Sequence, residues 1–144
     1  MELKFKKTHP DAVTPTKAHD TDAGFDLTAV SLEYNNELDI FEYDTGIAVE
    51  IPPGYVGFLT CRGSVSKTGF HLCNGVGTVD SPYRGSIRAR FYKRMIPGMR
   101  SQPYKVGDKI GQLIILELPK FELREVEELS DSSRGEGRFG STGK

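Results

Sequence analysis

Apolar and polar residues alternate along several short segments of the chain, and this period of two residues is typical of half-buried β-strands. Gly, Pro and Asp residues separate the segments and indicate turns between them. We expect strands over residues 3–7, 55–61, 86–92 and 109–118. Residues 38–51 are predicted to form two further short strands on either side of a turn at Asp44, Thr45 and Gly46. A short helical turn is expected only over residues 64–69.

The spacing of these strands predicts an all-β sandwich or barrel. A chain of 144 residues is long enough for a single domain with its own core. Its 16 Gly and 8 Pro residues exceed their average share, which agrees with many turns and few long helices.

The C-terminal residues 130–144 differ in composition from the rest of the chain. They contain four Gly and four Ser, and Phe139 is their single apolar side chain. Such a segment cannot bury enough apolar surface to fold alone. We therefore predict a β domain over residues 1–129 and a flexible C-terminal arm over residues 130–144 that closes over a ligand. An inert, frayed terminus is the alternative.

Charge, cysteine spacing and the lack of long apolar runs argue against a nucleic-acid partner, a zinc site and a membrane partner. The formal net charge of −1 provides no cationic field for a nucleic-acid backbone, so no DNA or RNA partner is expected. The two cysteines, Cys61 and Cys73, do not have the spacing of a zinc site. The sequence contains no secretory leader and no apolar run of the ~18 residues that a membrane span needs, which predicts a soluble, cytoplasmic protein with no membrane partner.

The segment 74–85, NGVGTVDSPYRG, combines turn residues with groups that can do chemistry. Pro82 favours a sharp bend, and a hairpin here would expose main-chain groups that can recognise a base edge by hydrogen bonds. Asp80 could orient or deprotonate a water molecule, and the ring of Tyr83 could enclose a sugar. Taken alone, such a segment is more often an ordinary β-turn with a capping Asp.

Two further segments carry groups suited to phosphate. Arg62, Ser64 and Lys67 follow the end of a predicted strand, where successive main-chain N–H groups can hold an anion. Gln112 is unusual for the middle of an apolar strand, and Asp26 lies among apolar residues in TDAGFDLTA. Each of these residues, taken alone, is more often a solvated polar side chain.

The C-terminal arm carries groups of the same kind. Arg134 and Arg138 can pair with phosphate oxygens, and Phe139 can stack on a base.

Five segments together resemble the five motifs of the trimeric dUTPase family, in the order of that family. They are DAGFDLTA at 22–29, CRGSVSKTG at 61–69, NGVGTVDSPYRG at 74–85, GDKIGQLII at 107–115 and RGEGRFGSTG at 134–143. One such motif would be a weak signal, but five in order with suitable gaps are specific.

The resemblance implies an all-β subunit with a distorted antiparallel jelly-roll (β-clip-like) fold and a flexible C-terminal arm. It implies a homotrimer in which three chains assemble each active site. The implied reaction is the hydrolysis of dUTP to dUMP and diphosphate by water attack on the α-phosphate, assisted by Mg²⁺. This reaction limits uracil incorporation into DNA and supplies dUMP for dTMP synthesis.

The resemblance also implies roles for individual residues. Asp80 activates the attacking water and contacts the sugar, Tyr83 packs against the deoxyribose, and Asp26 holds a water of the magnesium shell. The uracil site comprises Asn74, Gly77, Thr78 and Val79. The phosphate site comprises Arg62, Gly63, Ser64 and Gln112. The lid comprises Arg134, Phe139, Gly140, Ser141 and Thr142.

Two positions depart from the usual motifs of the family. Gly63 stands directly after Arg62, where the family usually has Ser, and Ser64 follows one place later. Arg138 stands before Phe139, where the family usually has Gly. Either Gly63 or Ser64 therefore occupies the place of the motif-two serine. Arg138 could add a phosphate contact or could stiffen the lid.

Three alternatives remain open at this point. A dCTP deaminase, or a bifunctional deaminase and dUTPase, has the same fold but needs an ionisable acid beside the base amino group, and the hairpin has none before Asp80. A dUTPase-like protein could instead act as a regulatory binding module. A structural or sugar-binding jelly roll would leave the charged arm unexplained.

Overall fold

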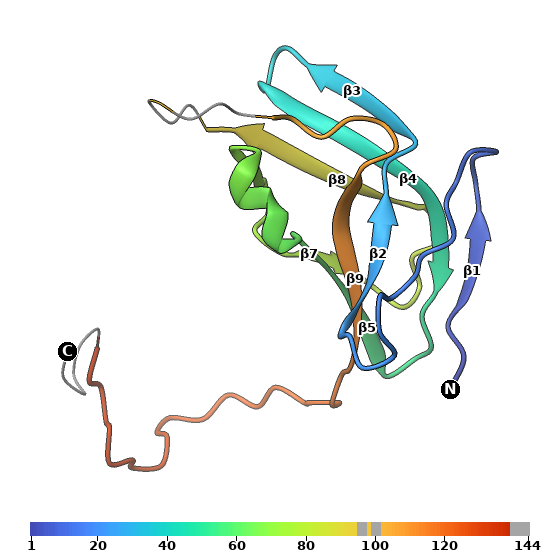
Figure 1. The fold of residues 1–144 in the computed structure, drawn as a ribbon. Helices are drawn as coiled ribbons and strands as arrows, with labels where there is room; N and C mark the ends of the chain where they lie inside the picture. The colour runs from blue at the N-terminus through green and yellow to red at the C-terminus, as the bar shows by residue number, and fades with distance from the viewer. Residues whose placement is uncertain (95–97, 99–101, 139–144) are drawn as a thin grey trace.

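The computed structural model describes residues 1–94, 98 and 102–138, and nearly all regular structure in them is β-strand (Figure 1). The elements are β1 (Lys4–Lys7), β2 (Gly24–Thr28), β3 (Ser31–Asn35), β4 (Ile40–Glu50), β5 (Tyr55–Thr60), the 3₁₀ helix η1 (Gly63–Lys67), β6 (Phe70–Leu72), β7 (Gly77–Val79), β8 (Ser86–Lys93) and β9 (Lys109–Glu117). The all-β prediction is confirmed, and the one expected helical turn lies at η1.

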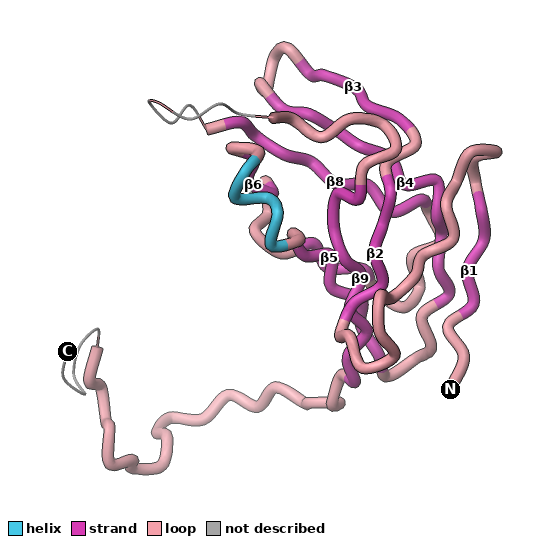
Figure 2. Tube along the Cα trace, viewed as in Figure 1, coloured by secondary structure: helices cyan, strands magenta, loops and turns pink. Residues whose placement is uncertain are grey.

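The strands form two antiparallel sheets that enclose one core (Figure 2). The first sheet has the order β1-β4-β8-β6, with β3 also pairing with β4, and the second has the order β2-β9-β5-β7. Alternate residues of both sheets face inward, as β8 shows with its buried Ile87, Ala89 and Phe91 between exposed neighbours. The largest fully buried side chains are Tyr43, Phe70, Phe91, Leu27, Ile47, Ile51, Ile110 and Leu113.

The predicted turn at Asp44, Thr45 and Gly46 is wrong. β4 runs through these residues as one strand, and its pairing with β8 shifts register between Asp44 and Ala48. Gly46 adopts φ 62°, and its N–H donates to the Asp44 side chain at 2.7 Å. The Thr45 hydroxyl donates to the carbonyl of Ile87 at 2.8 Å. The turn-forming residues therefore make a β-bulge within one long strand.

The strands β2, β6 and β7 were not predicted from the sequence, and neither was β3. Strand β3 pairs with the first half of β4, from Ser31 opposite Asp44 to Asn35 opposite Ile40. Its side chains are largely exposed, so it lacks the alternation of apolar and polar residues that marks a half-buried strand.

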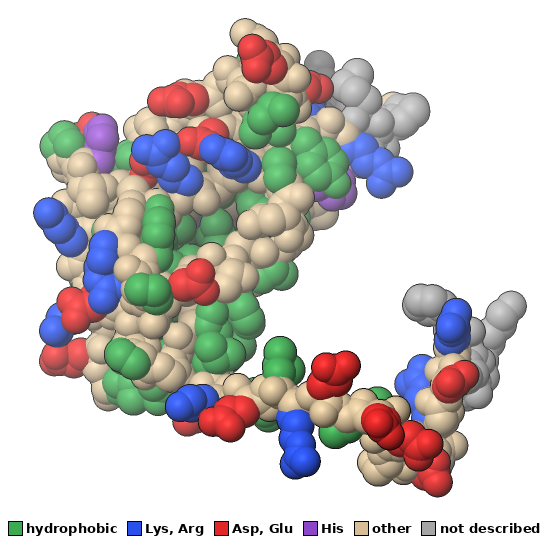
Figure 3. Space-filling view, turned by 180° about the vertical axis from the view of Figure 1, so that it is seen from behind, with side chains coloured by type: hydrophobic (Ala, Val, Ile, Leu, Met, Phe, Trp, Pro, Cys, Tyr) green, Lys and Arg blue, Asp and Glu red, His purple; other side chains and the backbone are tan. Residues whose placement is uncertain are grey.

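The chain leaves the sheets after β9, and the described residues 118–138 extend away from the body (Figures 1 and 3). This arm contains no regular strand, and its apolar side chains, among them Phe121 and Leu123, are exposed. The division between a domain over residues 1–129 and an arm over 130–144 stays a prediction. No helix among the described residues is long and apolar enough to cross a membrane.

Alanine substitutions at Gly46 and Gly54 distinguish the cost of backbone strain from the cost of side-chain crowding. In Gly46→Ala the new Cβ lies 2.8 Å from the Cβ of His9 in left-handed backbone, whereas Gly54 at φ 84° has open space around the same position. We expect Gly54→Ala to lower the free energy of unfolding by about 1–2 kcal/mol. Gly46→Ala should lower it by about 2–4 kcal/mol, as measured by urea denaturation. Equal losses would contradict close packing at the bulge.

Candidate functional site

Asp26 lies at the centre of a charged cluster that joins three parts of the chain. It belongs to β2, directly opposite Gln112 of β9, and its side chain is 7% exposed. Arg62, just after β5, donates from Nε to its Oδ1 at 2.9 Å, and Lys109 donates from Nζ to Oδ2 at 2.8 Å. Gln112 Nε2 lies 3.3 Å from Oδ1. The structure thus brings together the predicted residues Asp26, Arg62 and Gln112.

Two opposing effects set the pKa of Asp26. Burial disfavours the charged carboxylate and by itself would raise the pKa. The hydrogen bond from Lys109 and the positive charge of Arg62 outweigh burial, so the pKa of Asp26 lies below its ordinary value. The cluster therefore carries one negative charge and two positive charges at neutral pH.

Lys109 was not among the residues selected from the sequence. In a regular strand, residues 109 and 112 point to opposite faces, so the alternation of side chains gives no reason to group them. The pairing of β2 with β9 shifts register between Leu27 and Thr28, which places Thr28 opposite Lys109. This bulge turns the Lys109 side chain toward Asp26.

A basic pocket of about 700 Å³ lies beside this cluster. Its cationic lining residues are Arg62, Lys67, Lys105 and Lys109. Asp108 is the one acidic residue that lines it among the described residues. Ser64 lines the basic pocket and Gly63 does not, so the first exposed hydroxyl of η1 that faces it belongs to Ser64. The combination of cations and a hydroxyl suits a multiply charged anion.

A second pocket, of about 210 Å³, lies at the hairpin that follows β7. All six residues predicted for the base and sugar line it: Asn74, Gly77, Thr78, Val79, Asp80 and Tyr83. β7 pairs with β5, and the N–H of Tyr83 donates to the carbonyl of Asp80 at 3.0 Å, which closes the predicted bend. No described residue lines both this hairpin pocket and the basic pocket.

The Tyr83 ring is held at the mouth of the hairpin pocket by its hydroxyl, which donates to the carbonyl of Ser86 at 2.9 Å. Gly85 leaves room for this contact, because a Cβ there would collide with the hydroxyl. The Ser86 hydroxyl donates in turn to the Asp44 carboxylate, which also lies 3.0 Å from Nε of Arg88. The bulge of β4 therefore supports the residue that anchors Tyr83.

The Asp80 side chain is exposed in the hairpin pocket. No hydrogen bond or ion pair engages its carboxylate within the described part of the chain. An exposed carboxylate with free lone pairs can accept a proton from a bound water molecule.

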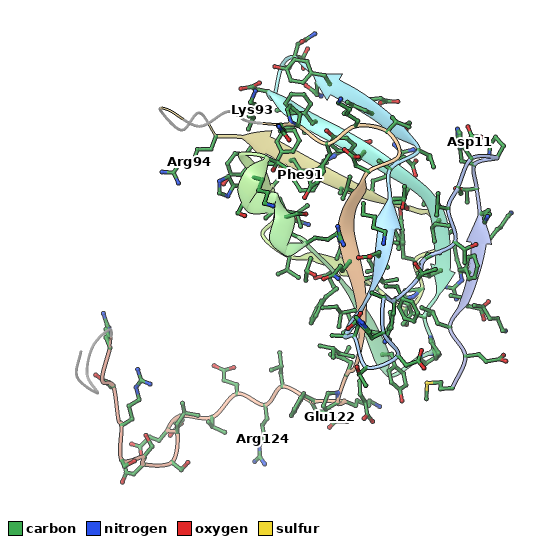
Figure 4. The ribbon with its side chains drawn as sticks, in the orientation of Figure 1. Asp11, Phe91, Lys93, Arg94, Glu122 and Arg124 are labelled. Carbon is green, nitrogen blue, oxygen red and sulfur yellow. The ribbon has the colours of Figure 1, made fainter. Side chains whose placement is uncertain are left out.

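Arg134, the one predicted lid residue within the described part of the chain, lines neither pocket. Arg134 lies near the end of the extended arm, where its Nε donates to the carbonyl of Gly137 at 3.2 Å. Figure 4 shows Glu122 and Arg124 on the same arm, with their side chains directed away from the body. The remaining lid residues, Phe139, Gly140, Ser141 and Thr142, lie outside the described residues.

The family model described as dUTPase matches residues 11–143. The chain belongs to the dUTPase family. Among curated proteins, it is 36% identical to the deoxyuridine 5'-triphosphate nucleotidohydrolase of Clostridium kluyveri over 144 residues, which cover 99% of each chain. The resemblance noted from the five motifs is thereby confirmed.

Solved structures agree with this assignment. A variant of the Staphylococcus bacteriophage 80alpha dUTPase, solved with dUpNHpp, matches with a TM-score of 0.80 and 30% identity over 99% of both chains. A mutant of the dUTPase from phage phi11 of S. aureus matches with a TM-score of 0.72 and 27% identity over 89% of this chain and 98% of that one, and its structure reveals details of the coordination of a structural Mg(II) ion. The predicted jelly-roll fold is confirmed by these likenesses.

Within the described part of the chain, side chains alone do not form a metal site. No group of three or more His, Cys, Asp or Glu residues that could hold an ion occurs among the described residues. Mg²⁺ commonly keeps several waters and is held by one or two carboxylates together with substrate phosphates. Asp26, a single ionised carboxylate beside the basic pocket, fits that mode of binding and not direct coordination by protein alone.

The ion pairs of Asp26 should make stability depend on pH. Because its pKa is lowered in the folded protein, their contribution is complete above the ordinary Asp pKa of about 3.9 and is lost as the pH falls through the lowered value. Arg62 and Lys109 remain partly exposed, which reduces the effect. Between about pH 5 and pH 2, the free energy of unfolding should fall about 1–2 kcal/mol further for wild type than for Asp26→Asn.

Chemical unfolding across this pH range measures the difference. Asp20→Asn, at an exposed aspartate, is the matched control and should follow wild type. Parallel curves for wild type and Asp26→Asn would show that these ion pairs do not contribute to stability.

Proposed function

We propose that this chain hydrolyses dUTP to dUMP and diphosphate. The observation that carries the proposal is the presence of two pockets with complementary chemistry in a member of the dUTPase family. The hairpin pocket offers main-chain groups, an aromatic ring and a free carboxylate, whereas the basic pocket offers cations and a hydroxyl. A nucleoside triphosphate needs both sets of groups.

The hairpin pocket is the proposed site for the nucleoside. Asn74 and the main chain of Gly77, Thr78 and Val79 recognise the uracil edge. The Tyr83 ring packs against the deoxyribose, and its anchored hydroxyl keeps the ring close to the sugar C2′ position. A ribose 2′-hydroxyl would collide with the ring, so UTP should be a poor substrate.

The basic pocket is the proposed site for the triphosphate. Arg62 and Ser64, which line the pocket, contact the phosphate oxygens, and Lys109 adds positive charge. Gln112, which contacts Asp26, and the main chain at Gly63 do not line the pocket in one chain and are proposed as further phosphate contacts. When bound, Mg²⁺ would neutralise charge on the phosphates and hold them in one conformation, with Asp26 retaining one of its waters. The lid residues Arg134, Phe139, Gly140, Ser141 and Thr142 complete the enclosure, and Arg138 supplies a further cation.

Asp80 acts as the general base in the proposed reaction. Its carboxylate accepts a proton from water as the water oxygen bonds to the α-phosphorus. The bond between that phosphorus and the oxygen bridging to the β-phosphate breaks, and diphosphate leaves with the electron pair. Positioning and charge neutralisation account for most of the acceleration, and the base adds about 10²–10⁴-fold.

A homotrimer with shared active sites is the proposed assembly. Within one chain the hairpin pocket and the basic pocket have no lining residue in common, and the described arm reaches neither. A second chain that brings its basic pocket against the hairpin, and a third that brings its arm, would complete each site. The cytoplasmic location expected from the sequence agrees with an enzyme of nucleotide metabolism.

Diphosphate release from dUTP, UTP, dTTP and dCTP tests the proposed activity. Only dUTP should be cleaved well, because the hairpin selects uracil and the Tyr83 ring selects deoxyribose. Asp80→Asn is the matched inactive variant and should bind dUTP normally while losing about 10²–10⁴-fold in turnover. Equal cleavage of UTP would remove the role of Tyr83, and ammonia release from dCTP would favour a deaminase instead.

Mixing two inactive variants tests the shared site. Asp80→Asn damages the nucleoside part and Arg62→Ala the phosphate part, so neither variant alone should turn over. If the two residues of one site come from different chains, trimers formed at random from equal amounts regain about one quarter of the intact sites. Activity should therefore reappear after the variants are unfolded together and refolded. Wild type refolded in parallel is the control. If wild type regains activity and the mixture does not, both residues of a site belong to the same chain.

A further inference from the structure

The hydroxyl of Tyr104 is a buried polar group without a partner. The residue is 7% exposed, and its hydroxyl oxygen makes no hydrogen bond within the described part of the chain. Buried polar groups are nearly always paired in folded proteins, because an unpaired one loses its hydration without compensation. A phenylalanine would fill the same space without this cost. The hydroxyl therefore calls for a functional explanation.

The position of Tyr104 is fixed by the core. Its ring lies 5.7 Å from that of Phe91, 5.9 Å from that of Phe70 and 6.3 Å from that of Tyr43, measured between centroids. The Tyr43 hydroxyl also donates to the Tyr104 carbonyl at 2.8 Å. Tyr104 is thus held through both its ring and its main chain, and its hydroxyl cannot swing away to reach water.

Tyr104 lies beside the basic pocket, and its hydroxyl oxygen is itself buried. Tyr104 lines that pocket together with Ser64 and Arg62. Burial raises the pKa of Tyr104, and the nearby Ser64 side chain and Arg62 charge offset part of that rise. Ser64 and Tyr104 thus line the same pocket, although their hydroxyl groups do not form a hydrogen bond of regular geometry in the free protein.

We propose that Tyr104 is a positioning residue that acts through Ser64 when phosphate is bound. The Tyr104 O–H donates to Oγ of Ser64, and the Ser64 O–H donates to a phosphate oxygen. A serine hydroxyl has one hydrogen to donate and two lone pairs to accept with, so the bond from Tyr104 directs its single hydrogen at the ligand. Hydroxyl groups in such a chain polarise and strengthen one another.

This inference rests on the proposed function for the identity of the ligand. It also indicates which residue, Gly63 or Ser64, takes the place of the usual motif-two serine. Ser64 lines the basic pocket, whereas Gly63 has no side chain to offer. η1 is a short, exposed element that does not by itself hold the Ser64 rotamer. A hydrogen bond from the Tyr104 hydroxyl, which is fixed by the aromatic core, would hold the Ser64 rotamer.

Tyr104→Phe tests the inference because it removes only the hydroxyl and keeps the ring. We expect its melting temperature to equal or exceed that of wild type, since an unpaired polar group is removed from the interior. We also expect kcat/KM for dUTP, and affinity for diphosphate by calorimetry, to fall by about tenfold. A residue with a purely structural role would change stability and activity in the same direction.

A double-mutant cycle with Ser64→Ala tests whether the effect of Tyr104→Phe on activity is exerted through Ser64. If Tyr104 acts through Ser64, adding Tyr104→Phe to Ser64→Ala should cause no further loss. Tyr92→Phe, at a partly exposed tyrosine stacked on His71, is the control and should behave as wild type.

The outcomes separate this inference from the proposed function. Wild-type activity in Tyr104→Phe, additive losses in the double variant, or a lowered melting temperature would each overturn the role of Tyr104 while dUTP cleavage by wild type stands. Failure of wild type to cleave dUTP would overturn the proposed function. In that case the diphosphate affinities of the same four proteins still decide whether Tyr104 and Ser64 are coupled.

Discussion

The basic pocket depends on the ion pairs that the Asp26 carboxylate forms with Arg62 and Lys109. Asp26 lies on β2, and its partners come from β9 and from the segment after β5, so one charge holds three segments in register. Without it, Arg62 and Lys109 would repel each other beside a largely buried strand. With it, the cluster keeps one uncompensated positive charge. The pairing thus holds two cations near each other and leaves them able to attract an anion.

The hairpin pocket depends on a comparable constraint in the other sheet. Asp44 lies at the bulge of β4 and accepts hydrogen bonds from the Gly46 N–H and the Ser86 hydroxyl. Ser86 begins β8 and presents its carbonyl to the Tyr83 hydroxyl. The backbone irregularity of β4 is therefore linked through Asp44 and Ser86 to the Tyr83 ring. Each half of the proposed site is supported by a carboxylate at a strand irregularity.

The sequence predicted the strands β1, β5, β8 and β9, and it placed Asp80 and Tyr83 in one hairpin. It failed where side-chain direction depends on a bulge. Asp44 and Gly46 are turn residues by propensity, but the pairing of β4 with β8 on one side and with β3 on the other keeps the chain extended through them. Lys109 was missed for the same reason, because its approach to Asp26 exists only through a register shift. The local pattern of apolar and polar residues predicts a regular strand, whereas the positions of β-bulges depend on pairing with strands that are distant in the sequence.

The two proposed chemical groups, the Asp80 carboxylate and the Tyr104 hydroxyl, share one property: neither has a partner in the described part of the chain. A fold tolerates such groups only where other contacts supply enough stability. The aromatic cluster of Tyr43, Phe70 and Phe91 does so for Tyr104, and the turn closed between Tyr83 and Asp80 does so for the hairpin. The Tyr104 ring and the main chain of the hairpin are therefore held in place before any ligand arrives, so the ligand need not supply the energy to order them.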